Sequence, residues 1–190
     1  MKNITVYCAS AANLAPVYIE AARELGREIV AAGAGAVTGG GRTGLMGAVA
    51  DAVLGVGGSI TGIIPQFMHE KGWHHSGLTE LRIVADMHER KRTMASLATG
   101  CIALPGGIGT FEELTEIITW RVLGLYKGNV VIYNVNDYYA PLLAQLGSAI
   151  EQGFMRPDHE GLFSVATSAR EAVEMALDPN PRTDFSAKFK

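Results

Sequence analysis

Short apolar segments alternate with segments of helical periodicity along almost the whole chain. Strands are predicted at 4–9, 36–38, 59–64, 81–85, 101–104 and 129–133, with a last short strand ending at Val165. Helices are predicted at 16–30, through 49–53, at 138–152 and at 168–177. Two more are predicted around the strand 101–104: one opens at Asp86 before it, and the other follows the turn after it and runs to about Leu125. This alternation is typical of a parallel β-sheet with helices on both faces, so we expect a doubly wound α/β (Rossmann-like) fold. The predicted organisation is one domain over 1–178 and a polar tail over 179–190.

Two of the predicted strands run directly into glycine-rich turns. Strand 36–38 enters the turn 39–44, and strand 101–104 enters the turn 105–110. Ligands of doubly wound folds bind beyond the carboxyl ends of the strands, so both turns should converge on one site. Glycine allows close backbone approach, and the amide groups of a following helix attract phosphate. The alternative is that the glycines only tighten the turns between strand and helix.

The first turn carries a weak dinucleotide signature. Gly39, Gly41 and Gly44 fit the pattern G-x-G-x-x-G, but 59–64 lacks the acidic residue that binds a ribose about 20 residues further on. This absence disfavours a nicotinamide-dependent oxidoreductase. No G-x-x-x-x-G-K-[ST] motif occurs, so an ATPase of that type is also disfavoured. The two turns suit a smaller ligand, such as a nucleoside monophosphate.

Charged residues lie close to the second turn and on the helix before it. Arg90 falls on an apolar stripe with Met87, Met94 and Leu97. A guanidinium in that position needs an anionic partner or must extend to the protein surface. The acids Glu112, Glu113 and Glu116 follow the turn; each alone could complement the helix dipole, but all three beside a phosphate site favour a catalytic role.

Composition excludes several classes of protein. The chain has 190 residues, a formal net charge of −3 and 48% hydrophobic residues, so we expect a globular protein that binds no nucleic acid. No apolar run is long enough to span a membrane, and no signal peptide is evident. Cys8 and Cys101 are expected to be buried thiols of a cytoplasmic protein. His74 and His75 lack a third ligand, so no metal site is predicted.

Three motifs together resemble one family. They are Gly39-Gly40-Gly41-Arg42-Thr43-Gly44-Leu45-Met46-Gly47, Met87-His88-Glu89-Arg90-Lys91 and Pro105-Gly106-Gly107-Ile108-Gly109-Thr110-Phe111-Glu112-Glu113. The set is similar to the Lonely Guy family of cytokinin riboside 5′-monophosphate phosphoribohydrolases, whose members are often labelled lysine decarboxylases. The resemblance covers about 6–154. One departure is Gly72, which stands where relatives usually carry glutamate.

The resemblance implies hydrolysis of the N-glycosidic bond of a cytokinin riboside 5′-monophosphate or AMP, without a cofactor, by a homodimer. It implies that Arg90 and Glu113 are catalytic. The substrate-binding residues that it implies, together with those of the first loop, are Ser10, Gly40, Gly41, Thr43, Arg90, Lys91, Gly106, Gly107, Ile108, Gly109, Thr110, Phe111, Glu112 and Thr119. A general nucleoside monophosphate nucleosidase and a non-catalytic nucleotide carrier are the alternatives.

Overall fold

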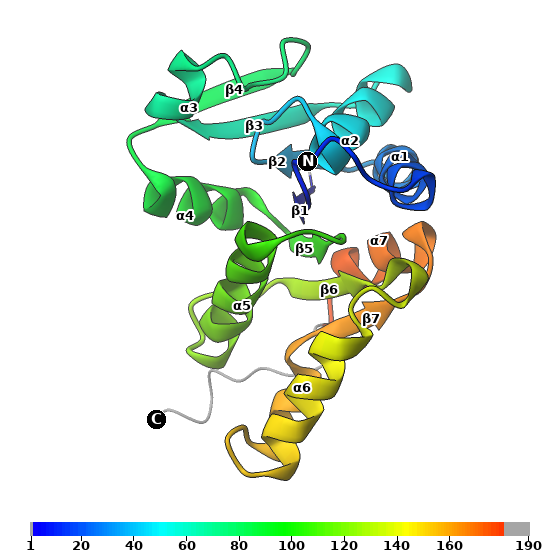
Figure 1. The fold of residues 1–190 in the computed structure, drawn as a ribbon, viewed down its shortest axis with the longest axis vertical. Coiled ribbons are helices and arrows are strands. Elements are labelled where there is room, and N and C mark those ends of the chain that lie inside the picture. The colour runs from blue at the N-terminus through cyan, green and yellow to red at the C-terminus, as the bar shows by residue number, and fades with distance from the viewer. Residues whose placement is uncertain (1, 181–190) are drawn as a thin grey trace.

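The protein contains one sheet of seven parallel strands. Its structure is a computed structural model that describes residues 2–180; most of the predicted tail 179–190 lies outside these residues. The strand order is β4-β3-β2-β1-β5-β6-β7 (Figure 1). The strands are β1 Asn3–Tyr7, β2 Gly35–Thr38, β3 Ile60–Pro65, β4 Glu80–Val84, β5 Gly100–Ala103, β6 Asn129–Tyr133 and β7 Ser164–Ala166. The predicted doubly wound α/β fold is therefore confirmed.

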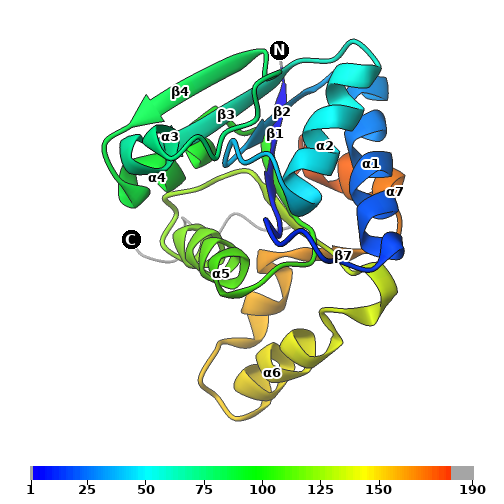
Figure 2. The ribbon, with the colours of Figure 1, turned by 45° about the horizontal axis from the view of Figure 1, so that its top comes forward.

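Helices cover both faces of this sheet (Figures 1 and 2). On one face lie α1 (Pro16–Ala31), α2 (Gly44–Gly55) and α7 (Ala169–Leu177). On the other lie α4 (Met87–Leu97) and α5 (Ile108–Val122), with α6 (Ala140–Glu151) at the end of the molecule beside β7. The remaining helical segments are α3 (Gln66–Glu70) and the 3₁₀ turns η1 (Val135–Asp137) and η2 (Pro157–Leu162).

Both sheet faces are buried, which explains why the strands are almost continuously apolar. In β6, Val131 packs with the α1, α2 and α7 layer, whereas its neighbours Val130 and Ile132 pack with the α4 and α5 layer. Successive side chains of a strand point to opposite faces, so a strand covered on both sides needs apolar residues at every position.

The strand order reverses between β1 and β5. The chain builds the sheet outward from β1 through β2, β3 and β4, and then returns to add β5 on the other side of β1. Beyond the two strands, the Leu104 amide donates to the Tyr7 carbonyl (2.9 Å) and the Ala9 amide to the Pro105 carbonyl (3.1 Å). A crevice opens where the following loops diverge, which is the usual ligand position in such sheets.

The elements differ from the prediction mainly at their ends. The helix expected to reach about Leu125 ends at Val122, and Gly124 follows with a φ of 71°. Asp86, at which the helix was expected to open, caps α4 by accepting from the Glu89 amide (2.8 Å), while the Glu89 carboxylate accepts from the Ala85 amide (2.7 Å).

The segment 66–79, which has no sequence period, contains α3 and then pairs with the first glycine turn. His74 forms an isolated antiparallel bridge with Gly41, and the His75 amide donates to the Gly40 carbonyl (2.9 Å). His75 Nε2 lies 2.9 Å from a carboxylate oxygen of Asp51. The segment is therefore held over the first glycine turn by bonds to residues far away in the sequence.

The expected thiols are free and buried at Cys8 and Cys101. Within residues 2–180 no helix is both long and apolar enough to cross a lipid bilayer. The same residues contain no cluster of three histidine, cysteine or carboxylate side chains placed to bind a metal ion.

Candidate active site

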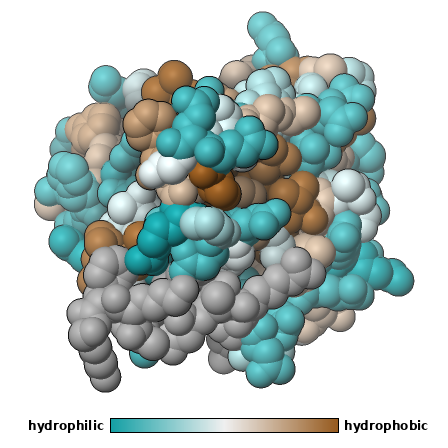
Figure 3. Space-filling view, turned by 90° about the horizontal axis from the view of Figure 1, so that it is seen from below, coloured by the Kyte–Doolittle hydropathy of each residue, from teal (hydrophilic) through white to brown (hydrophobic). Residues whose placement is uncertain are grey.

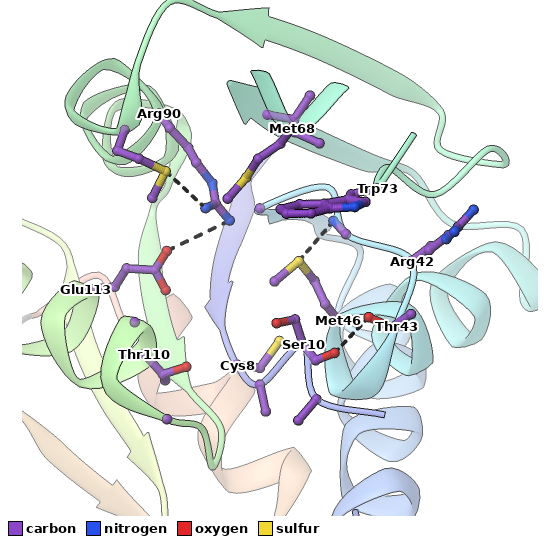
Figure 4. Close-up of a pocket in the computed structure, with 18 of the residues that line it drawn as sticks. Cys8, Ser10, Arg42, Thr43, Met46, Met68, Trp73, Arg90, Thr110 and Glu113 are labelled. Carbon is purple, nitrogen blue, oxygen red and sulfur yellow. Dashed lines mark hydrogen bonds and ion pairs between the residues drawn. The ribbon is translucent and has the colours of Figure 1, made fainter. Parts of the chain in front are cut away.

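A cavity of about 660 Å³ lies at the switch point between β1 and β5. Residues after β1, the first glycine turn, α4 and the start of α5 form its walls (Figure 4). The two glycine turns therefore converge on one site, as predicted. Their helices contribute differently to it.

Two amides at the start of α2 are already bonded within the protein. The Leu45 and Met46 amides both donate to the Ala9 carbonyl, at 3.0 and 3.3 Å. Gly44, at the first position of the helix, has a φ of 63°, and a Cβ there would lie 2.5 Å from the Ala11 carbonyl oxygen. Only glycine allows this close contact, which draws the start of α2 against the loop after β1.

The amide end of α5 remains open. Gly107 precedes the helix, and the amides of Ile108, Gly109 and Thr110 have no acceptor within residues 2–180. Such amides lack intrahelical partners and, together with the helix dipole, form an anion site. The cavity reaches this end of α5 through Gly107, Gly109 and Thr110.

Two tyrosines hold the turn that leads into α5. Tyr138 donates its hydroxyl to the Gly106 carbonyl, and Tyr139 donates to the Leu104 carbonyl (2.8 Å). Both follow η1, whose residues Asn136 and Asp137 adopt left-handed conformations (φ 50° and 55°). The carbonyl groups of the turn are thus bonded behind it, which leaves its amide groups for the cavity.

Arg90 and Glu113 face each other across the cavity floor (Figure 4). Nη2 of Arg90 lies 4.0 Å from Oε1 of Glu113, and both side chains are buried. Arg90 therefore has the anionic partner that its apolar surroundings require. Its Nε is buried without a partner among the described residues, so the guanidinium keeps a free donor.

Gly39, at the end of β2, makes room for this guanidinium. A Cβ at Gly39 would lie only 1.5 Å from Nη2 of Arg90. The first glycine of the loop therefore contributes by its lack of a side chain, because a Cβ there would displace the Arg90 guanidinium from this position.

The pKa of Glu113 is raised to about 7. Burial is the largest cause, because it disfavours the charged carboxylate; Arg90 acts in the opposite direction and lowers the pKa. A carboxyl group with a pKa near neutrality can exist in either protonation state, which suits acid–base chemistry or the stabilisation of a cation.

Lys91, the neighbour of Arg90 on α4, lies outside the cavity lining. Its ammonium group donates to Glu112 and, at 3.0 Å, to Glu116. Burial lowers the pKa of Lys91, but the two carboxylates more than offset that effect and the net shift is upward. This lysine links α4 to α5.

Part of the cavity wall, beside the polar residues Ser10, Arg42 and Thr43, is apolar. Met46 from α2, Met68 from α3 and the ring of Trp73 lie across the cavity from the charged pair (Figure 4). Trp73 is 46% exposed, and the Lys71 ammonium lies 4.8 Å from its ring centre. An aromatic face flanked by thioether groups suits a flat, apolar ligand group.

The structure brings nine of the predicted site residues to the cavity: Ser10, Gly41, Thr43, Arg90, Gly107, Gly109, Thr110, Glu112 and Glu113. Six others lie outside its lining: Gly40, Lys91, Gly106, Ile108, Phe111 and Thr119. Thr119 is on the exposed side of α5, where its hydroxyl donates to the Thr115 carbonyl (2.8 Å). Gly106 lies beneath Thr110, since a Cβ there would be 2.0 Å from Oγ1 of Thr110.

Some lining residues were not predicted. Gly39, Met46 and Met87 belong to the motifs quoted above, so their place near the site had a signal in the sequence. Met68 and Trp73 had none, because the segment that carries them has no period and no motif.

The fold and the position of the cavity define an α/β protein of the Rossmann type, with its ligand site at a switch point. Solved structures share this architecture. A molybdenum cofactor binding protein from Rippkaea orientalis matches 91% of the chain, and 93% of its own length, with a TM-score of 0.69 and 19% identity. The molybdenum cofactor carrier protein of Chlamydomonas reinhardtii matches 90% of the chain and 93% of its own length, with a TM-score of 0.67 and 20% identity.

Sequence relatives identify the family. Residues 46–176 match the family model described as possible lysine decarboxylase. The chain is 44% identical over 179 residues to the cytokinin riboside 5′-monophosphate phosphoribohydrolase of Rhodococcoides fascians, covering 94% of this chain and 90% of the relative. It is 41% identical over 189 residues to LOG1 of Arabidopsis thaliana, covering 100% and 89%. The chain belongs to the Lonely Guy (LOG) family of cytokinin riboside 5′-monophosphate phosphoribohydrolases.

Proposed function

We propose that this protein hydrolyses the N-glycosidic bond of a cytokinin riboside 5′-monophosphate and releases the free base and ribose 5-phosphate. The observation that carries the proposal is the buried Glu113 carboxyl group, which faces Arg90 next to the open amide end of α5. The relatives named above carry this activity in their names. No cofactor is required for such a hydrolysis.

In this proposal, different groups of the cavity bind different parts of the nucleotide. The amides of Ile108, Gly109 and Thr110 bind the 5′-phosphate, and Glu113 lies near the ribose. In the reaction the bond between C1′ of the ribose and the base nitrogen breaks, water adds to C1′, and the base nitrogen gains a proton. Positive charge builds on the ribose as the bond breaks. The Glu113 carboxylate stabilises this charge and orients the water, while Arg90 keeps the carboxylate in place.

The apolar wall favours a base with an apolar N6 substituent over plain adenine. Met46, Met68 and Trp73 offer thioether and indole surface but few hydrogen-bond donors. An added isopentenyl group would bury apolar area there, which is worth about 0.8 kcal/mol per methylene group. General nucleoside monophosphate nucleosidase activity is the alternative, in which AMP would be used equally well.

Chromatography of the free base tests these proposals directly. The protein is incubated with N6-isopentenyl-AMP and with AMP, and kcat/KM is compared for the two. Glu113→Gln and Arg90→Ala should each abolish base release. Matched controls are Glu174→Gln on α7 and Arg92→Ala on α4, both exposed positions outside the cavity lining, which should retain turnover. Wild-type protein that binds the nucleotide but releases no base would instead indicate a carrier.

We also propose a homodimer in the cytoplasm. Large apolar side chains are exposed at Ile108, at Leu123 and Leu125 after α5, and at Phe154 after α6. Figure 3, which looks from the end of the molecule that carries α6, shows apolar patches within the polar surface. Light scattering of the purified protein tests the dimer, and Leu125→Glu should weaken it. The two free, buried thiols suit a reducing compartment, and cell fractionation tests that location.

A further inference from the structure

Helix α4 carries two consecutive cations that contact different carboxylates of α5. Arg90 lies in the cavity and faces Glu113 at 4.0 Å. Lys91 donates instead to Glu112 and Glu116, and only 8% of its side chain is exposed. Consecutive residues of a helix point about 100° apart, which sends the two cations to different sides of α5. Lys91 is absent from the cavity lining, and two of its three ammonium donors go to these carboxylates.

We propose that Lys91 is a positioning residue, which controls the protonation of Glu113 from outside the cavity by neutralising the acids on either side of it. This inference rests on the hydrolase function proposed above. Glu112 precedes Glu113 directly, and Glu116 follows one helical turn later. Glu116 is a neighbour of both Glu112 and Glu113 on the helix surface, at i,i+4 and i,i+3 spacing, and like charges at these spacings repel each other. Lys91 and Arg90 supply two positive charges against these three negative ones, so removal of Lys91 leaves Glu113 between two unpaired acids.

The groups around Glu113 come from four parts of the fold: Arg90 and Lys91 of α4, Glu112 and Glu116 of α5, Tyr7 and Cys8 at the end of β1, and Tyr139 before α6. The last three have a raised pKa because they are buried, so they are neutral near pH 7. Within residues 2–180, the charged groups that shift the pKa of Glu113 therefore come from α4 and α5.

These charges act on Glu113 with opposite signs. Burial raises its pKa most, Arg90 and Lys91 lower it, and Glu112 and Glu116 raise it. Loss of Lys91 should therefore move the titration of Glu113 to higher pH, whereas loss of Glu116 should move it to lower pH. A role that was only structural would not give two variants with opposite shifts.

The test measures the titration of Glu113 by carbon-13 NMR of glutamate-labelled protein, in the wild type, Lys91→Met, Glu116→Gln and the double variant. The midpoint should rise in Lys91→Met and fall in Glu116→Gln, each by about one pH unit. It should return close to the wild-type value in the double variant and in Lys91→Arg, which keeps the charge. The acid limb of kcat/KM for N6-isopentenyl-AMP should shift in the same directions.

Several results would overturn the proposal. One is an unmoved Glu113 midpoint in Lys91→Met together with weaker binding of ribose 5-phosphate, which would make Lys91 a direct ligand of the nucleotide. Another is a shift of the Glu113 midpoint in the same direction in Lys91→Met and in Glu116→Gln. If Lys91→Met alone does not fold, the double variant compared with Glu116→Gln isolates the loss of Lys91, and a Glu113 midpoint that does not rise between these two variants overturns the proposal. The NMR titration needs no substrate, so a wild type without hydrolase activity would refute the proposed function and leave this test readable.

Discussion

Replacement of Gly39 by alanine is a sharp test of the site, because it adds one methyl group directly behind the Arg90 guanidinium. The new Cβ would lie 1.5 Å from Nη2 and 2.7 Å from Cζ of Arg90. An ordinary contact between such atoms is about 3.5 Å. The guanidinium must therefore move by about 2 Å, out of the position in which it faces Glu113.

The expected loss of activity is much larger than the loss of stability. Misplacement of a catalytic group by about 1 Å can cost about 100-fold in rate, so kcat/KM of Gly39→Ala should fall by at least about 100-fold. Overpacking costs about 1–3 kcal/mol in unfolding free energy. For Gly39→Ala the loss of unfolding free energy should lie near the lower limit of this range, because the guanidinium is the mobile end of a flexible side chain. Base release measures kcat/KM, and urea denaturation measures the free energy of unfolding.

Gly55→Ala is the matched control. Gly55 is the last residue of α2, its φ is not positive, and a Cβ there meets no atom within 4 Å. This variant should keep the wild-type kcat/KM and gain up to about 1 kcal/mol in stability, because alanine favours the helix more than glycine does. Wild-type kcat/KM in Gly39→Ala would refute the reasoning, since it would mean that Arg90 is not needed where the structure places it.

Three further variants test other parts of the site. Tyr138→Phe removes the donor to the Gly106 carbonyl, worth about 0.5–1.5 kcal/mol, and should weaken ribose 5-phosphate binding by roughly 2- to 12-fold in calorimetry. Glu113→Gln should raise the unfolding free energy at pH 8 by about 1–3 kcal/mol, because a folded-state pKa of about 7, against 4.5 when unfolded, makes the ionised carboxyl destabilising as pH rises through that window. The gain should vanish below pH 4.5, and a variant less stable than wild type at pH 8 would contradict it. Gly106→Ala should lower the unfolding free energy by about 1–3 kcal/mol, because its Cβ would lie 2.0 Å from Oγ1 of the stiff Thr110 side chain. A Cβ at Gly107 meets no atom within 4 Å, so Gly107→Ala should not lower the unfolding free energy. Equal melting temperatures of the two variants would contradict this prediction.

Sequence patterns were sufficient where the local chain determines the structure. The alternation of apolar and helical segments gave the parallel sheet, and the glycine turns after β2 and β5 meet at one cavity because the carboxyl ends of parallel strands share one edge. Arg90 needed an anionic partner because its stripe is apolar, and the structure places Glu113 at 4.0 Å.

Contacts between distant segments could not be read in the same way. Trp73 reaches the cavity because its segment bonds to the first glycine turn, through the Arg42 amide and the Trp73 carbonyl (3.2 Å). That pairing leaves no period in the sequence. Likewise the direction of Lys91 depends on which carboxylates of α5 lie opposite it, and that depends on how two helices pack against the sheet.

The bonds that the Ala9 carbonyl accepts from Leu45 and Met46 have a consequence for ligand selection. They occupy two amides at the start of α2, whereas the amides of Ile108, Gly109 and Thr110 at the start of α5 have no acceptor within residues 2–180. In the proposed binding mode, a molecule with a single phosphate places that phosphate at α5 and its uncharged end on the side of Trp73. A pyrophosphate group, as found in nicotinamide dinucleotides, would meet the Ala9 carbonyl oxygen at the start of α2, where it needs the Leu45 and Met46 amides as donors.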